Sequence, residues 1–135
     1  MCNSFPSGRI FVLGDGTLLE EGISNMLILH SQLSVTRILY TDDHTLYDLV
    51  NSEHPSAIFI NEFDALDTER VVRLIFSVPL AFVRCVIVAH IENSKLDIYD
   101  RPMTPALAMM YRRKSIVVNT TEEFINLALK IPCCV

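Results

Sequence analysis

Residues 9–23 read RIFVLGDGTLLEEGI and contain the pattern on which the predicted fold depends. The run Arg9–Leu13 is mostly apolar, as in a short strand of a sheet that is covered on both faces. Thr17 and Glu20 have the spacing of a capping box, which predicts that a helix begins there. The stretch therefore predicts a strand, a turn and a helix in succession.

The same alternation recurs along the rest of the chain. Apolar or β-branched runs predict four further strands, at residues 35–40, 56–60, 84–89 and 115–118. Capping residues predict the other helix starts, at Asp42 or Asp43, Asp67, Thr104 before Pro105, and Thr120 with Glu123. Strands that alternate with helices form a parallel sheet on which the helices pack. We therefore expect the α/β class, with a five-stranded parallel sheet and helices on both faces, (βα)5.

The chain of 135 residues is expected to form one domain, residues 1–135, with its core at about residues 8–131. His90–Met103, which reads HIENSKLDIYDRPM, fits this scheme least well, because it is long for a connection between a strand and a helix. We interpret it as a contact loop or a tolerated insertion.

Composition excludes several classes of protein. The net charge of −5 argues against a nucleic-acid surface, since neutralising phosphates requires clustered Lys and Arg. We interpret the one basic run, Arg112-Arg113-Lys114, as the end of a helix, where the helix dipole favours cations. The chain is 50% hydrophobic, but no apolar stretch approaches the roughly 18 residues of a membrane span. We expect a cytoplasmic protein that binds neither nucleic acid nor membrane and has an oligomer or partner interface.

Four stretches carry a resemblance to a known family: IFVLGDGTLLEEGI (10–23), PSAIFIN (55–61), RCVIVAH (84–90) and SIVVN (115–119). In order and spacing they resemble the receiver domains of bacterial two-component response regulators, closest to those that are joined to a helix-turn-helix domain. The resemblance covers about residues 8–131. It implies the (βα)5 sheet and a phosphate site outside the carboxyl ends of the strands, where open parallel sheets bind ligands.

The resemblance also implies where the residues of that phosphate site lie. Two adjacent acids that hold Mg²⁺ in the family correspond to Gly14 and Asp15, and the phosphorylated aspartate corresponds to Asn61. An amide oxygen is neutral and a weak nucleophile, so Asn61 cannot form an acyl phosphate. Asp15 without a second acid is a poor Mg²⁺ site, although Glu62 could add an oxygen if it turned inward.

The remaining positions depart from the family pattern as well. The Thr or Ser that contacts the phosphoryl group corresponds to Ala89, and the Lys corresponds to Asn119. The aromatic residue three positions before that Lys corresponds to Ile116. Without the Lys, the charge of a transferring phosphoryl group is not stabilised. We therefore expect a degenerate pseudo-receiver: a phosphorylation-independent signalling or regulatory module, such as half of a transcription regulator. It would have no catalytic residues, metal or cofactor.

Two arrangements of the amides at this site remain open. Asn61 and Asn119 either donate hydrogen bonds to Asp15 or face water at the strand ends. His90 follows the fourth predicted strand at the rim of the same pocket, with Glu62. We expect His90 to hydrogen-bond the backbone of a loop.

The third and fourth predicted helices are apolar nearly all round, which indicates either deep burial or a dimer or partner interface, and we favour the interface. Its anchors would be Met109, Met110 and Tyr111, because Met adapts its shape and Tyr tolerates a wet rim. The partner would be another protein or a second copy of the chain, with a homodimer expected.

A different class of function is the alternative: a flavodoxin-like small-molecule or nucleotide-binding protein or enzyme that uses the loops at residues 14–17 and 61–64. Gly14-Asp15-Gly16 begins a dinucleotide-binding pattern, but Leu19 stands where its third glycine is needed. Of the four cysteines, Cys85 is expected to be a small buried thiol, and all four are interpreted as incidental to function.

Overall fold

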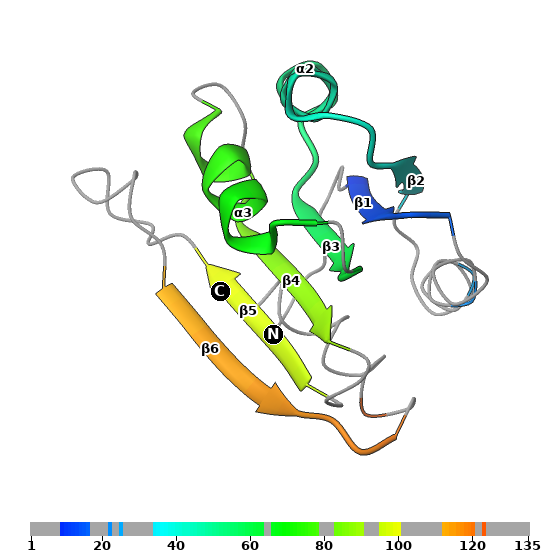
Figure 1. Ribbon diagram of the computed structural model, residues 1–135, viewed down its shortest axis with the longest axis vertical. Helices are drawn as coiled ribbons and strands as arrows, with labels where there is room; N and C mark the ends of the chain where they lie inside the picture. Colours follow the sequence, from blue (N-terminus) through cyan, green and yellow to red (C-terminus); the bar gives the residue numbers. More distant parts are fainter. Residues whose placement is uncertain are drawn as a thin grey trace.

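The computed structural model describes residues 9–16, 22, 25, 34–63, 66–78, 83–90, 95–100, 112–120 and 123. Its strands form one six-stranded sheet (Figure 1). They are β1 (Arg9–Gly14), β2 (Ser34–Leu39), β3 (Ala57–Asn61), β4 (Cys85–His90), β5 (Lys95–Asp100) and β6 (Arg112–Val117). The helices with defined bounds are α2 (Asp43–Glu53) and α3 (Thr68–Ser77), and the backbone is also helical at Gly22, Asn25 and Glu123.

The sheet is mixed, with the strand order β2-β1-β3-β4-β5-β6. Strand β1 pairs in parallel with β2 and β3, and β3 pairs in parallel with β4. Strand β5 is antiparallel to both β4 and β6. Strands β1 to β4 coincide, within a residue or two at each end, with the first four predicted strands.

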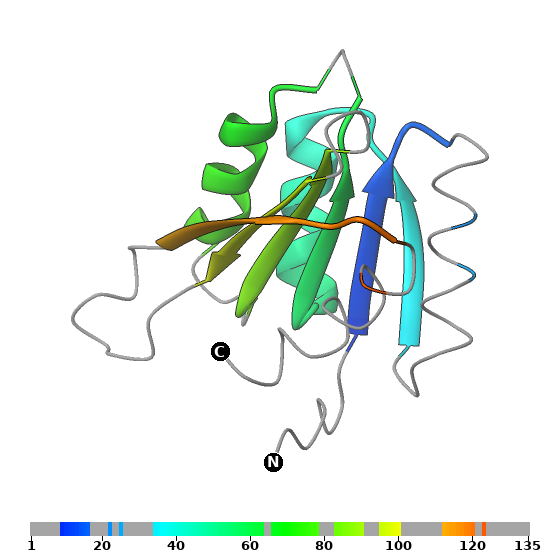
Figure 2. The same ribbon diagram turned by 90° about the horizontal axis from the view of Figure 1, so that it is seen from below.

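The predicted five-stranded parallel sheet with helices on both faces is wrong. Residues 95–100 are not part of a connection but form β5 beside β4, and this inserts a strand between β4 and β6. A short link over residues 91–94 suffices because antiparallel neighbours, unlike parallel ones, need no long crossover. The basic run Arg112-Arg113-Lys114 begins β6 and is not a helix end. The two helices with defined bounds, α2 and α3, lie on one face of the sheet (Figure 2).

Each face of the sheet carries an apolar cluster, because alternate residues of a strand point to opposite faces. The cluster on the helix side joins the inward residues of α2 and α3 to one face of the strands: Phe11, Leu13, Ile38, Leu46, Val50, Ile58, Ile60, Val71, Val72, Ile75, Phe76, Val86, Val88 and Tyr99 among others. The opposite cluster contains Ile10, Val12, Ala57, Phe59, Cys85, Ile87, Ala89, Leu96, Ile98 and Val118. Strands β1, β3 and β4 are thus buried on both sides, as their continuous apolar sequences predict.

The two helices begin at the predicted caps. Asp42 accepts a hydrogen bond from the backbone N–H of Thr45 at 2.7 Å, and Asp67 accepts one from the N–H of Arg70 at 3.3 Å. Arg70 of α3 also reaches α2, with its Nε 3.5 Å from Asp43 Oδ2. These contacts hold the helices side by side over the apolar face.

Met109, Met110 and Tyr111, the predicted interface, lie outside the described residues. In the part of the chain that the structure describes, no helix has the length and apolar character needed to cross a membrane.

Cys85 is buried in the cluster on the face opposite the helices, which confirms its prediction as a buried thiol. Burial is the main reason that its pKa is raised to about 12, with a smaller contribution from the negative charge of Asp100. We expect Cys85 to resist iodoacetamide in the folded protein at about pH 8, because the reagent attacks the thiolate. Digestion and mass spectrometry should find the peptide unmodified, whereas the same peptide from urea-denatured protein should be fully alkylated. Equal labelling of both samples would contradict this packing.

Candidate functional site

A group of polar side chains gathers where β3 and β4 end, on the face that carries α3. It consists of Glu62 just after β3, His90 at the end of β4, Asp97 on β5, and Arg113 and Ser115 on β6; we call it the Asp97 cluster. The strand register explains the grouping, since Asp97 lies opposite Val88 on one side and opposite Ser115 on the other. Residues two apart share a face, so His90 and Arg113 point to the same side as Asp97.

Asp97 is the centre of this cluster. Its side chain is only 2% exposed, and a buried carboxylate is stable only when it is paired. His90 Nε2 and Arg113 Nη2 lie 2.7 and 3.0 Å from Asp97 Oδ2, respectively. The Ser115 hydroxyl donates to the other oxygen, and Lys95 Nζ lies 3.7 Å from it.

These partners decide the charge of Asp97. Loss of solvent through burial, the largest single effect, raises the pKa of its carboxyl group. The hydrogen bonds from Ser115 and His90 and the charge of Arg113 act in the opposite direction and together prevail, so that the pKa lies below its usual value. The cluster therefore holds an ionised carboxylate in the interior.

His90 bridges two carboxylates. Its Nδ1 lies 2.8 Å from Glu62 Oε1, opposite the contact that its Nε2 makes with Asp97. Each ring nitrogen of His90 thus faces a carboxylate oxygen. The expectation that His90 bonds the backbone of a loop is wrong. Glu62 in turn accepts a hydrogen bond from Thr68 Oγ1 at 2.9 Å, and this ties the start of α3 to β4 through His90.

The contacts determine what the cluster can do chemically. The Ser115 hydroxyl donates to Asp97 and not to His90, so His90 does not stand as a general base beside a serine nucleophile. Among the described residues, no three or more His, Cys, Asp or Glu side chains are grouped so that they could hold a metal ion. The geometry is that of a charged cross-link between β3, α3 and the three last strands.

Sequence reasoning missed Asp97, Arg113 and Ser115. One signal was available: KLDI at residues 95–98 alternates polar and apolar side chains, as a strand with two different faces does. Asp97, on the polar side of that alternation, lies on the face that carries α3, where it is buried and paired.

The residues singled out by the resemblance are brought together only in part. Gly14 and Asn61 end the adjacent strands β1 and β3, and Asn61 lies opposite Ala89 on β4. Ala89 in turn lies opposite Leu96 on β5, and Leu96 lies opposite Ile116 on β6. The inserted strand thus separates Ile116 from Ala89, although both contact the same apolar cluster.

The flanking positions lie outside the sheet. Asp15 is exposed just after β1, and Asn119 is exposed after β6, where its backbone N–H donates to Glu123 Oε2 at 2.9 Å. A site that needs Asn119 or Ile116 next to Ala89 is therefore not formed in this sheet.

One of the two expected arrangements required the amide of Asn61 to face water. Asn61 is only 6% exposed, so its amide does not face water. Its Oδ1 is buried and has no hydrogen-bond partner among the described residues. Buried acceptors are nearly always paired in folded proteins, and an unpaired one calls for an explanation. The atom lies at the carboxyl end of β3, where open α/β sheets bind ligands.

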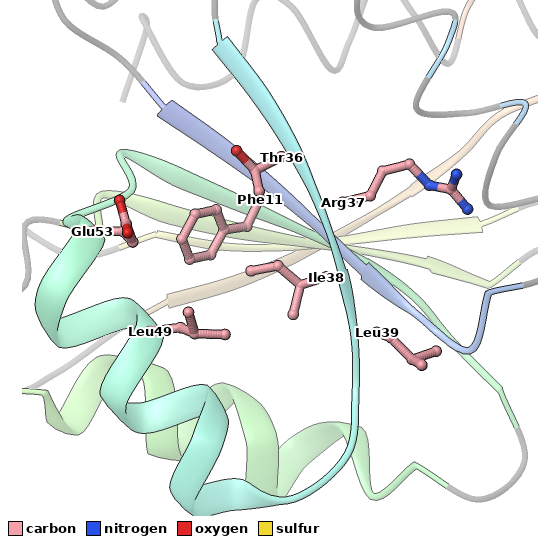
Figure 3. A pocket seen from close by; sticks show the side chains of 7 residues that line it. All are labelled: Phe11, Thr36, Arg37, Ile38, Leu39, Leu49 and Glu53. Carbon is pink, nitrogen blue, oxygen red and sulfur yellow. The ribbon is translucent and has the colours of Figure 1, made fainter.

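A hollow of about 420 Å³ lies between β2 and α2, and is lined by Phe11, Thr36, Arg37, Ile38, Leu39, Leu49 and Glu53. Figure 3 shows Phe11 and Ile38 directed toward α2, whereas Arg37 points away from it. Glu53 at the rim pairs with Arg9. No pattern in the sequence indicated this hollow, whose lining comes from β1, β2 and α2.

No family model matches the chain, and no curated protein or solved structure matches it. The resemblance to receiver domains therefore rests on the sequence stretches alone.

The substitution Asp97→Asn is expected to destabilise the protein by about 3 kcal/mol near neutral pH, because it leaves His90 and Arg113 without their charged acceptor. Folding lowers the pKa of Asp97, so its contribution is complete above the unfolded-state pKa and is lost as the pH falls through the folded-state pKa. The difference from the unchanged protein should therefore shrink below about pH 4. Urea unfolding followed by circular dichroism at several pH values measures both effects.

Asp48→Asn is the matched control, since the exposed Asp48 pairs only loosely with His44 at 3.4 Å. Its effect should stay within about 0.5 kcal/mol. A loss of stability in Asp97→Asn that is the same at every pH would show that shape, and not charge, is what the site requires.

Proposed function

We propose that this protein is a non-catalytic signalling or regulatory module that acts through protein contacts and does not use an aspartyl phosphate. The observation that carries the proposal is Asn61, which lies buried beside Ala89 at the carboxyl end of β3. A phosphoryl acceptor in this position needs a carboxylate, and an amide cannot form the acyl phosphate.

The state of the neighbouring charges supports the same proposal. Glu62, the nearest acid after Asn61, already accepts a hydrogen bond from Thr68 and faces His90. A carboxylate held in this way is a poor ligand for Mg²⁺, which requires near-ideal octahedral geometry. The charges of the Asp97 cluster are likewise paired with one another, since His90 and Arg113 both contact Asp97.

The contact part of the proposal is supported by the two outermost strands. Leu39 on β2 and Val117 on β6 are the exposed large apolar side chains in the described part of the chain, at 59% and 67% exposure. Outermost strands also present backbone donors and acceptors to a partner. Met109, Met110 and Tyr111 precede β6 in sequence and remain part of the proposed contact, with a homodimer as its simplest form.

A second candidate function is the binding of a small molecule at the ends of β1 and β3, and the unpaired Asn61 Oδ1 favours it. The strand order reverses between these two strands, and ligands bind at such switch points. The ligand would need an N–H or O–H donor for the amide oxygen. A panel of nucleotides and flavins separates the candidates, since a rise of several degrees in the unfolding midpoint with one compound would favour this second function.

The protein is expected to form no phosphoryl adduct with acetyl phosphate and Mg²⁺, because the amide oxygen of Asn61 is too weak a nucleophile. Intact-mass spectrometry checks the adduct, and amide NMR spectra with beryllium fluoride check for a mimic bound without a bond. Asp15→Asn, which removes the acid after β1 at nearly constant volume, is the matched control and should give the same spectra. An adduct on the unchanged protein that is lost in this variant would sink the proposal.

Met110→Asp is expected to convert a dimer into a monomer, because it places a charge in the proposed apolar contact. Light scattering over a range of concentrations measures the mass. Ser52→Asp, an exposed substitution on α2, should leave the mass unchanged. If the unchanged protein is itself monomeric throughout the range, the contact must be made with a different protein.

A further inference from the structure

Ser115 follows directly on the basic run Arg112-Arg113-Lys114. The run lies in β6, which is the outermost strand on its side of the described sheet, and Ser115 is exposed there. The serine hydroxyl also touches the most buried charge of the Asp97 cluster, since it donates to Asp97 Oδ1. One residue thus combines access from outside with a contact to the charged interior.

We propose that Ser115 is a phosphorylation site for an ATP-dependent serine kinase that selects basic residues before its acceptor. Kinases discriminate among substrates by charge patterns, and Ser115 has arginines three and two residues before it. The Ser115 oxygen forms a bond to the γ-phosphorus of ATP while the bond from that phosphorus to the β–γ bridging oxygen breaks. ADP leaves with the electron pair, and the hydroxyl proton passes to the catalytic carboxylate of the kinase.

The charge pattern distinguishes Ser115 from a serine in comparable surroundings. Ser34 is also exposed, and it begins β2, the outermost strand on the other side of the sheet. The residues before it, LHSQL at 29–33, contain neither Lys nor Arg. Ser34 therefore serves as an internal control for accessibility without the basic pattern.

Phosphorylation would reverse the interaction between Ser115 and Asp97. A phosphate carries a charge of about −1.5 to −2 at pH 7, so a donor to the carboxylate becomes a like charge beside it. Among the described residues, the cations near Asp97 are Arg113, with Nη2 3.0 Å from Oδ2, and Lys95, with Nζ 3.7 Å from Oδ1. Both would be drawn to the phosphate, since arginine binds it with two parallel hydrogen bonds.

If Arg113 and Lys95 turn to the phosphate, Asp97 loses most of its partners. Asp97 would keep His90, which is shared with Glu62, while Arg113 would also give up its 3.9 Å approach to Glu69 of α3. A buried carboxylate with fewer partners is costly, so the pairing of β5 with β6 and the contact of α3 with β6 should loosen. The inference goes beyond the proposed function and does not depend on Asn61.

The test uses the full chain with Mg²⁺, ATP and the catalytic subunit of cyclic-AMP-dependent protein kinase, which selects arginines before serine. Site mapping by mass spectrometry should find phosphate on Ser115 and none on Ser34. Arg112→Gln should slow the reaction at least about tenfold, whereas Lys114→Gln, which removes the same charge one residue before the acceptor, should change it less. Ser115→Ala should abolish incorporation, and Ser115→Thr, which keeps a hydroxyl, should retain it.

The structural effect is measured on the phosphorylated chain itself. Its folding equilibrium constant should fall at least about tenfold, and amide exchange should accelerate in β5 and β6. Ser115→Ala loses one hydrogen bond without adding charge and should show a smaller loss. Two results would overturn the proposal: a folded chain that resists the kinase although a peptide of residues 109–119 is modified, or a phosphorylated chain with unchanged stability and exchange.

Discussion

A buried carboxylate cannot remain unpaired, and this constraint on Asp97 organises one whole side of the molecule. The partners of Asp97 come from the end of β4, from β6 and from its own strand. Through His90 the constraint reaches Glu62 and the first residue of α3. Removing any one of these partners leaves charge in a poorly solvated place, so the elements that supply them must be positioned together.

The pairing of β5 with β4 and β6 makes this arrangement possible, and it also decides what the carboxyl edge of the sheet can do. Strands β2, β1, β3 and β4 keep the order of an open parallel sheet with a switch point between β1 and β3. Strand β5 then pairs antiparallel with β4, in the place where a parallel strand was expected. As a result, Ile116 on β6 lies two strands away from Ala89, the neighbour of Asn61 on β4. Residues that a parallel sheet would bring to one pocket are thereby distributed along the edge.

The sequence predicted those features that are set by local chemistry. The caps at Asp42 and Asp67 and strands β1 to β4 could be read from short patterns, because capping and continuous burial act within a few residues. Strand β5 was missed because its inward side carries Asp97, and a strand with a charge facing the core contradicts the binary pattern. What makes that charge acceptable lies at His90 and Ser115, which are 7 and 18 residues away in the chain. Pairing over such distances has no periodic signature in a single sequence.

Asn61 and Asp97 are the buried polar residues of the described core, and they differ in a way that bears on function. Asp97 is fully engaged, whereas Asn61 Oδ1 has no partner, at a cost of about 1–3 kcal/mol. Its strand neighbours on the same face, Ala57 and Phe59, are apolar, and an apolar side chain at position 61 would avoid that cost. The oxygen of this amide therefore lowers the stability of the fold. Natural sequences break such local rules mainly at functional sites, so the end of β3 is the place where this chain departs from what its stability alone requires.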